Sequence, residues 1–266
     1  MSDPISQRSL YPVLITCLLV AGLISCRPSY RADDPAFEQA RENAELANEG
    51  FKRSQRFVEG WLPHADSTTG LIPVNLDDEQ DIWNPEDAAA DNYPFMVLTA
   101  AMSNYPRFQG RMRQILQTEK ELTSRLGSLP DTYSFPEDDF VSASPNLDDI
   151  IFRAQEYVKD GLMPITEWLG PHNPWTDRML EITDDLWERA PVDTKHGKIL
   201  SRSHEINGEA LQTLPRLYWM TGEEAYLDRA IRLGDYYLLG DHHPTRDADE
   251  LRLIDHGSEI ISGLTE

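Results

Sequence analysis

The chain has 266 residues, of which 46 are acidic and 24 are basic, so its formal charge is −22. This excess of carboxylates argues against a nucleic-acid partner, because contacts with phosphate need clustered Lys and Arg. Two cysteines are too few for a disulfide scaffold, whereas a hydrophobic content of 40% is enough for a packed core. The composition therefore indicates an acidic globular protein and specifies no activity.

The N-terminal segment has the pattern of a secretory signal. The apolar stretch from Tyr11 to Ile24 is too short to span a bilayer comfortably and has the length of a signal-peptide core. It ends in Leu23-Ile24-Ser25-Cys26, which resembles the lipobox of bacterial lipoproteins. The resemblance implies cleavage before Cys26 and diacylation of that cysteine, and two acyl chains anchor a protein stably to a membrane. An ordinary secretory signal with a coincidental cysteine is the alternative.

Cleavage there divides the chain into a signal peptide of residues 1–25, a tether of residues 26–34 and a helical domain of residues 35–266. The expected location is the bacterial cell envelope, with the domain facing the periplasm or the exterior. The signal peptide contains Cys17, so the mature chain has no disulfide. It also carries one acidic and one basic side chain, Asp3 and Arg8, so the charge of −22 belongs to the mature part.

Apolar residues recur at helical spacing through the rest of the chain, and we expect about eight helices. The first covers residues 37–61. The second begins at Asn84-Pro85 and the fifth at Asn173-Pro174, because Asn is a favoured N-cap and Pro fits the first helical position. The second extends to residue 102 with a kink at Pro94.

The other expected helices cover residues 108–126, with Gly127 as the C-terminal cap, residues 144–158, residues 204–220 with a bend at Pro215, and a segment with Tyr226 to Leu238 on its apolar face. The last of these follows Thr221-Gly222-Glu223-Glu224, which is typical of a capping box. The eighth begins near Asp255. No alternating run predicts a strand, so we expect an all-α fold.

Two segments carry a family resemblance. They are LYWMTGEEAYLDRAIRLGDYYL, residues 217–238, and HADSTTGLIPVNLDDEQDIWNPEDAAADNYPF, residues 64–95. Both resemble six-hairpin glycosidase-like proteins, and the resemblance extends over residues 36–266. It implies stacked αα-hairpins that form part of an (α/α)₆ toroid. A tetratricopeptide-like solenoid is the alternative, although no fixed repeat of about 34 residues is present. A full toroid has about twelve helices, so we expect a chain truncated at its C-terminus, or else a shorter superhelix.

The resemblance implies carbohydrate chemistry, and glycoside cleavage needs a carboxylic acid and a carboxylate base or nucleophile. Asp87 and Asp91 are four residues apart, so they share one face of a helix, and mutual repulsion would raise the pKa of one of them. His204 and Glu205, at the start of a later helix, complete the candidate catalytic set. Acidic residues in a first helical turn also complement the helix dipole without any catalytic role.

Four further residues are candidates for substrate binding, namely Trp83, Arg202, His256 and Glu259. Trp83 either stacks on a sugar or packs at the entry to a helix. His204-Glu205 resembles the start of the zinc motif H-E-x-x-H, but position 208 is Gly, so the second histidine is missing. We therefore expect no metal and no cofactor.

The combined expectation is a surface-anchored glycoside hydrolase whose partners are an oligosaccharide or polysaccharide and, through the lipid, a membrane. A polysaccharide lyase, with Arg202 neutralising a uronate, is an alternative. A non-catalytic lipoprotein that binds a saccharide or a protein is another. The positions of the carboxylates discriminate between them, since a pair about 5–10 Å apart in one cleft supports hydrolysis and dispersed carboxylates contradict it.

Overall fold

The structure is a computed structural model that describes residues 34–76, 81–247, 249–250 and 253–266. The expected signal peptide and Cys26 lie outside these residues, as does the tether except for Asp34. The chain divides into two units, residues 1–50 and residues 51–266. Most of the described residues are helical and the strands are short, so the fold class is all-α, as the sequence predicts.

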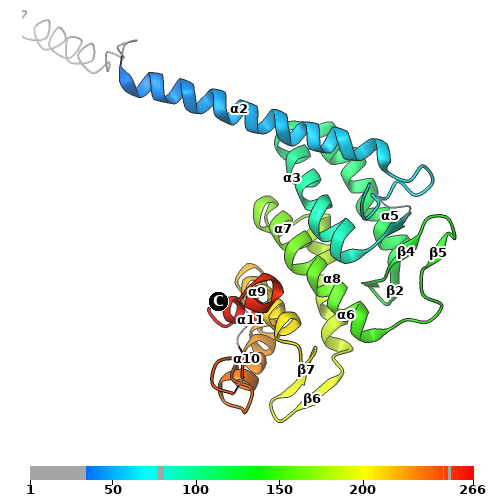
Figure 1. Cartoon of the computed structure of the whole chain (residues 1–266), viewed down its shortest axis with the longest axis vertical. Helices are drawn as coiled ribbons and strands as arrows, with labels where there is room; N and C mark the ends of the chain where they lie inside the picture. The colour runs from blue at the N-terminus through cyan, green and yellow to red at the C-terminus, as the bar shows by residue number, and fades with distance from the viewer. Residues whose placement is uncertain (1–33, 77–80, 248, 251–252) are drawn as a thin grey trace, which may run out of the picture. The chain divides into compact units, whose positions relative to one another are not determined.

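The described elements follow one another in the order shown in Figure 1. The α-helices are α2 (Pro35–Trp61), α3 (Tyr93–Ser103), α4 (Tyr105–Arg107), α5 (Arg113–Thr123), α6 (Leu147–Glu156), α7 (Met163–Leu169), α8 (Pro174–Glu188), α9 (His204–Thr221), α10 (Glu224–Leu238) and α11 (Glu259–Gly263). Three π-helical turns continue directly into α3, α5 and α7: η2 (Pro85–Asn92), η3 (Phe108–Met112) and η4 (Tyr157–Leu162). Two 3₁₀ segments are η1 (Leu62–His64) and η5 (Asp255–Ser258).

The two expected asparagine caps are present. The side-chain oxygen of Asn84 accepts hydrogen bonds from the backbone N–H groups of Asp87 at 3.0 Å and Ala88 at 2.9 Å, with Pro85 at the first helical position. Asn173 accepts two backbone hydrogen bonds at the start of α8 in the same manner. These short polar side chains satisfy N–H groups that have no partner inside the helix.

Both prolines expected inside helical segments lie there. The predicted helix from residue 84 to residue 102 is η2 followed by α3, and the change from π to α geometry falls between Asn92 and Tyr93, beside Pro94. Pro215 lies within α9. A proline removes one backbone donor and its ring crowds the preceding turn, so a local change of helical geometry is the expected response.

Two predicted boundaries in the middle of the chain are wrong. The helix expected to reach residue 126 ends at Thr123, where the chain enters the hairpin of β2 (Ser124–Leu126) and β3 (Leu129–Pro130). Gly127 has a φ of +67° in the turn of this hairpin and caps no helix. The helix expected from residue 144 begins at Leu147, because Asn146 supplies the cap.

The predicted capping box is also wrong. Thr221 is the last residue of α9, and Gly222, with a φ of +74°, forms a left-handed C-terminal cap. The Thr221 hydroxyl donates to the Leu217 carbonyl and accepts from the N–H of Glu223. The glycine ends one helix before the next can use the threonine as an N-cap.

Short antiparallel strands occur between the helices, although the sequence predicted none. β1 (Ile82–Trp83), β4 (Tyr133–Ser134) and β5 (Asp139–Phe140) form a three-stranded sheet. β6 (Val192–Thr194) and β7 (Gly197–Ile199) form a hairpin between α8 and α9. Strands of two or three residues are too short to show an alternating pattern, which explains why the sequence did not predict them.

The core is built around aromatic residues of η3, α3 and α8. Phe108 stacks on Trp175 with ring centroids 5.2 Å apart. The indole N–H of Trp175 donates to the hydroxyl of Tyr93 at 2.9 Å, and that hydroxyl donates to the carbonyl of Met112 at 2.5 Å. Each buried polar atom of these aromatic side chains therefore has a partner, as buried groups require.

Candidate functional site

Acidic side chains from several helical segments converge on one region, which we call the carboxylate cluster. Its members are Asp87 and Asp91 of η2, Glu156 of α6, Asp160 of η4, Glu205 and Glu209 of α9, His256 of η5 and Glu259 of α11. Ligand atoms of Glu156, Glu205, Glu209 and His256 all lie within 4.8 Å of one another. These seven carboxylates are therefore gathered in one region together with His256.

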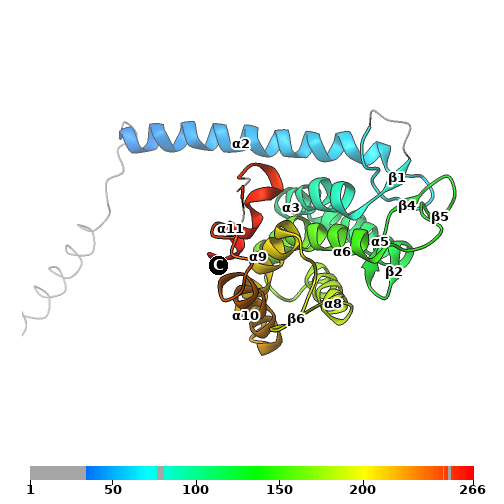
Figure 2. The same ribbon diagram turned by 60° about the horizontal axis from the view of Figure 1, so that its bottom comes forward.

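Two glycines let the backbones that carry the cluster approach closely. A Cβ at Gly161 of η4 would lie 2.9 Å from the carbonyl oxygen of Ala89 in η2. A Cβ at Gly208 of α9 would collide with the backbone of Glu259 in α11. Figures 1 and 2 both show α11 lying against α9. Because no side chain separates these segments, their polar residues are held within reach of one another.

The buried floor of the cluster is a pair of glutamates. Glu209 is fully buried and Glu156 is 5% exposed. Burial raises the pKa of both carboxyls, and their proximity adds to the increase for Glu209. Within the described part of the chain, no group donates a hydrogen bond to either oxygen of Glu209. Two carboxylates so close in a poorly hydrated place cannot both carry a negative charge without a proton or a cation between them.

The open side of the cluster is formed by His256 and Glu205. The Nδ1 atom of His256 lies 3.2 Å from Oε1 of Glu156 and 3.0 Å from Oε1 of Glu205. The side chain of His256 is 43% exposed and that of Glu205 is 29% exposed. The cluster thus extends from a buried pair of carboxylates to side chains that reach solvent.

Lys159 is the cation that borders the cluster from η4. Its ammonium group lies 3.1 Å from Asp160 and 3.1 Å from Glu259. Burial alone would lower the pKa of Lys159, but the surrounding carboxylates, Asp160 foremost, raise it. Gln212 of α9 donates a further hydrogen bond to Glu259. Lys159 therefore remains charged and is already paired with two carboxylates.

Asp91 behaves as the sequence predicts for one member of a close acidic pair. Its pKa is raised by burial first, then by the charges of Asp87 and Asp160, while His256 acts in the opposite direction. Asp87 is tied to the helix start, since the side-chain N–H of Asn84 donates to it at 2.6 Å. A carboxyl with a raised pKa on an exposed residue is suited to hold a proton and to donate it.

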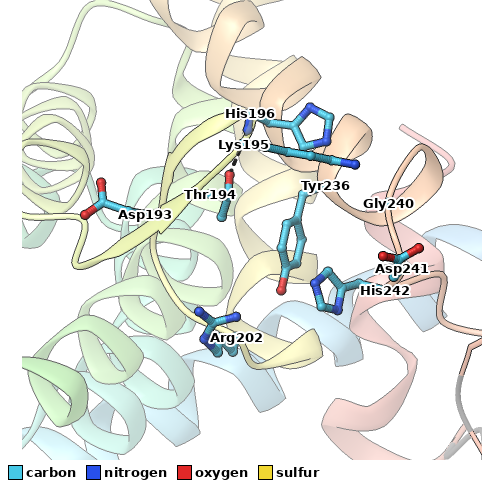
Figure 3. A pocket seen from close by; sticks show the side chains of 9 residues that line it. All are labelled: Asp193, Thr194, Lys195, His196, Arg202, Tyr236, Gly240, Asp241 and His242. Carbon is cyan, nitrogen blue, oxygen red and sulfur yellow. Dashed lines mark hydrogen bonds between the residues drawn. The ribbon is translucent and has the colours of Figure 1, made fainter.

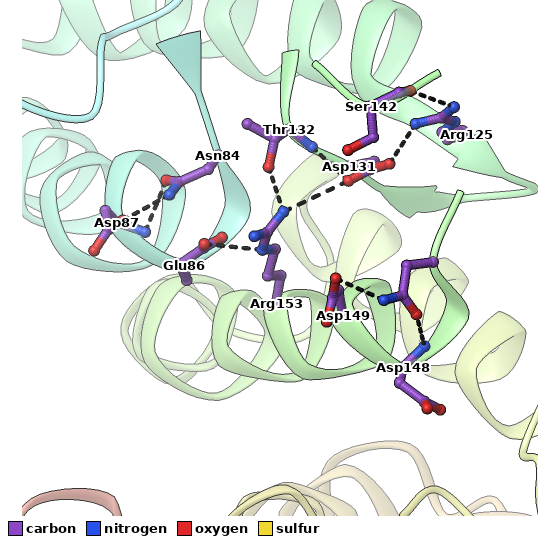
Figure 4. A network of polar contacts seen from close by, with 11 residues as sticks. Asn84, Glu86, Asp87, Arg125, Asp131, Thr132, Ser142, Asp148, Asp149 and Arg153 are labelled. Atoms are coloured by element: carbon purple, nitrogen blue, oxygen red, sulfur yellow. Dashed lines mark hydrogen bonds and ion pairs between the residues drawn. The ribbon is translucent and has the colours of Figure 1, made fainter. Parts of the chain in front are cut away.

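A second network, of ion pairs and hydrogen bonds around Arg153, also holds the start of η2 in place. Figure 4 shows the guanidinium of Arg153, from α6, between Glu86 and the loop that carries Asp131 and Thr132. Arg153 lies 2.9 Å from Glu86 and donates to the Thr132 hydroxyl at 2.6 Å. Burial raises the pKa of Glu86, and Arg153 partly offsets this effect. The network immobilises the first turn of η2, from which Asp87 projects.

The remaining predicted residues lie elsewhere. Trp83 is 2% exposed and packs edge-on against Tyr157 with ring centroids 6.5 Å apart, so it is a core residue with no free face for a sugar. His204 packs against the ring of Tyr237, and its pKa is lowered by burial and then by His242. His204 therefore does not join the neighbouring Glu205 in the cluster.

Arg202 lines a separate pocket of about 280 Å³ between the β6–β7 hairpin and the segment that follows α10. The other lining residues are Asp193, Thr194, Lys195, His196, Tyr236, Gly240, Asp241 and His242 (Figure 3). The rings of Tyr236 and His242 stack with centroids 4.4 Å apart. Among the described residues, neither Arg202 nor Lys195 has an acidic partner within ion-pair distance.

Sequence reasoning missed the buried half of the cluster. Glu156 and Asp160 are four residues apart, as are Glu205 and Glu209, and this spacing places each pair on one helix face. The spacing was the available signal. What the sequence does not reveal is that α6 and α9 turn these faces toward each other.

Comparison with protein-family models, with characterised proteins and with solved structures finds no match to this chain. Among the described residues, no helix combines the length and the apolar character needed to cross a membrane. Function is therefore inferred from the chemistry of the residues that the fold brings together.

Proposed function

We propose that the chain is a carbohydrate-active hydrolase that cleaves glycosidic bonds by carboxylate acid/base chemistry at the carboxylate cluster. The proposal includes the six-hairpin glycosidase-like resemblance, with the helical hairpins as part of an (α/α)₆ toroid. It also includes a lipid anchor at Cys26 that holds the enzyme at the bacterial cell envelope. The substrate would be a neutral oligosaccharide or polysaccharide, because a strongly acidic protein repels polyanions.

The observation that carries this proposal is that Asp91, whose pKa is raised, belongs to the same cluster as Glu205 on its open side. The pKa of the Asp91 carboxyl is raised by burial and by neighbouring acidic groups, so it retains a proton to a higher pH than an ordinary carboxyl. Glu205 lies on the open side of the cluster beside His256. In the proposed reaction Asp91 protonates the leaving glycosidic oxygen. Glu205 accepts a proton from the water that attacks the anomeric carbon.

The test is hydrolysis of a panel of oligosaccharides by the Asp91→Asn and Glu205→Gln variants. Loss of a general acid or base lowers kcat/KM by about 10²–10⁴-fold, so both variants should be nearly inactive on whichever oligosaccharide the wild type cleaves. Asp228→Asn on the exposed face of α10 is the matched control and should retain activity. Wild-type activity in Asp91→Asn would contradict the proposed role of Asp91.

The pocket around Arg202 favours a second candidate, a polysaccharide lyase. Arg202 and Lys195 can neutralise the carboxylate of a uronate, and Tyr236 and His242 are candidate bases beside them. A base would remove the proton from the carbon next to that carboxylate, the glycosidic C–O bond would break to leave a double bond, and the proton would pass to the leaving oxygen, so no water is consumed. An ultraviolet-absorbing unsaturated product from a uronate polymer, lost in Arg202→Ala, would support the lyase over the hydrolase.

A further inference from the structure

Glu209 is a fully buried carboxylate, and none of the residues that the structure describes donates a hydrogen bond to either of its oxygens. Removing an ionised carboxylate from water is costly unless a proton or a cation compensates for the lost solvation. The neighbouring ammonium and imidazole groups already have other partners. Lys159 is paired with Asp160 and Glu259, and His256 lies against Glu156 and Glu205.

The neighbours of Glu209 are groups that bind metal ions. Oxygens of Glu156 and Glu205 and a ring nitrogen of His256 converge on Glu209 with all four atoms within 4.8 Å of one another. Ligands about 2.0–2.2 Å from a single ion lie at most about 4.4 Å apart. A small inward movement of the side chains is therefore enough to complete a coordination shell.

The geometry points to a divalent transition-metal site formed by Glu156, Glu205, Glu209 and His256. Carboxylates with one imidazole suit Mn²⁺ or Zn²⁺ better than Mg²⁺ or Ca²⁺, which prefer oxygen ligands alone. The ion would supply the positive charge that Glu209 lacks. The exposed side of His256 and Glu205 would let water or a substrate oxygen reach it.

The backbone also favours such a site. Glu205 and Glu209 are one helical turn apart on α9, which places both carboxylates on the same face. Counted from His204, the zinc motif H-E-x-x-H would place its second histidine at position 208, which is Gly. In the proposed site α9 supplies Glu205 and Glu209 as ligands in place of two histidines. Gly208 allows α11 to approach, and the chain immediately before α11 carries His256.

This inference goes beyond the proposed hydrolase and does not rest on it, because cation binding is measured without substrate. The two roles of Glu205 are compatible, since a carboxylate has two oxygens and about four lone-pair sites. One oxygen can hold the ion while the other accepts a proton from water. If no cation binds, the metal site is contradicted but the hydrolase proposal is not. The hydrolase proposal is decided separately by the activity of the Asp91→Asn and Glu205→Gln variants.

The experiment is isothermal titration calorimetry of the full chain, freed of metal by a chelator, with ZnCl₂ and with MnCl₂. We expect one equivalent of ion to bind with micromolar or tighter affinity. Glu209→Gln keeps the size of the side chain but removes its charge, and should weaken binding by at least about tenfold, the smallest effect usual for a metal-site partner. Asp228→Asn, an exposed carboxylate of α10 outside the carboxylate cluster, is the matched control and should bind as the wild type does.

A second measurement keeps the test decisive if Glu209→Gln does not fold. Pulsed electron paramagnetic resonance of the Mn²⁺-loaded wild type should show coupling to an imidazole nitrogen, and His256→Ala should lose it. Absence of saturable binding of both ions to the folded wild type would overturn the proposal. Equal affinity in wild type and in folded Glu209→Gln, or a nitrogen coupling that persists in His256→Ala, would overturn it as well.

Discussion

Gly208 of α9 lies directly against the backbone of Glu259 in α11, with no space for a side chain between them. The contact is reciprocal, because a Cβ at Gly263 of α11 would collide with the carbonyl oxygen of Gly208. Gly208 and Gly263 therefore fix how closely α9 and α11 approach. This distance sets the position of the segment that carries His256 relative to Glu205 and Glu209. The packing of α11 on α9 and the assembly of the cluster depend on the same contact.

Gly208→Ala should accordingly separate α11 from α9. Overpacking a tight contact costs about 1–3 kcal/mol or more, which exceeds the gain of about 0.5–1 kcal/mol expected from replacing glycine by alanine within a helix. We expect a lower free energy of unfolding in urea and weaker binding of Zn²⁺ and Mn²⁺. Gly234→Ala in α10 is the control, because nothing lies within 4 Å of its added Cβ. That variant should be slightly stabilised, and equal behaviour of the two variants would contradict the role assigned to Gly208.

The fold could be predicted from the sequence where local chemistry decides it. Asn84-Pro85 and Asn173-Pro174 start helices because the cap and the first turn lie within a few residues of each other. Gly127 was assigned to the wrong motif, because a positive φ serves a hairpin turn as well as a helix cap. Only the pairing of β2 with β3 decides between the two uses.

The site could be predicted only in its exposed half. Asp87 and Asp91 were recognisable from their spacing, although the pKa of Asp91 is raised by burial first and by the expected repulsion from Asp87 second. Glu156 and Glu209 have the same four-residue spacing to an acidic neighbour, but their raised pKa values come from burial created when α6 packs on α9, which the spacing does not show. His204 was grouped with Glu205 by adjacency in sequence, yet consecutive residues of a helix point in different directions.

A buried ion pair joins α5 to α8. The guanidinium of Arg178 donates from Nε to Glu119 at 3.1 Å, and both side chains are almost completely buried. Glu119→Gln should lower the free energy of unfolding by about 3–5 kcal/mol, because it leaves the arginine charge without its partner. Replacing both residues, Glu119→Leu with Arg178→Met, should cost less than the single change. Urea denaturation of the three variants checks this, and a double variant less stable than Glu119→Gln would contradict it.

Asp185 should make folding sensitive to acid. Burial alone would raise its pKa, but hydrogen bonds from Ser128 and the ion pair with Arg189 at 2.7 Å lower it below the ordinary value. A carboxyl whose pKa is lower in the folded state stabilises the fold above its unfolded pKa of about 3.9. This contribution is lost as the pH falls through the lowered value.

The measurement for Asp185 is the urea midpoint of the wild type and of Asp185→Asn from neutral pH into the acid range. The variant should be less stable at neutral pH, and the difference should shrink as the pH falls below the ordinary carboxyl pKa. Asp228→Asn on the exposed face of α10 is the control and should differ little from the wild type in stability at neutral pH. A gap between wild type and Asp185→Asn that stays constant down to the most acidic pH would contradict the lowered pKa.

Asn84 links helix capping to the candidate site, because it caps η2 and also donates to Asp87 at 2.6 Å. Asn84→Ala should cost about 0.5–2 kcal/mol of stability, as the loss of an N-cap usually does. It should also lower activity on oligosaccharides, because the turn that carries Asp87 and Asp91 loses its fixed start. Asn173→Ala removes the equivalent cap of α8, far from the cluster in sequence and on a helix that supplies none of its carboxylates. Its stability loss should be similar while activity is retained, so activity lost equally in both variants would show that capping acts on the site only through overall stability.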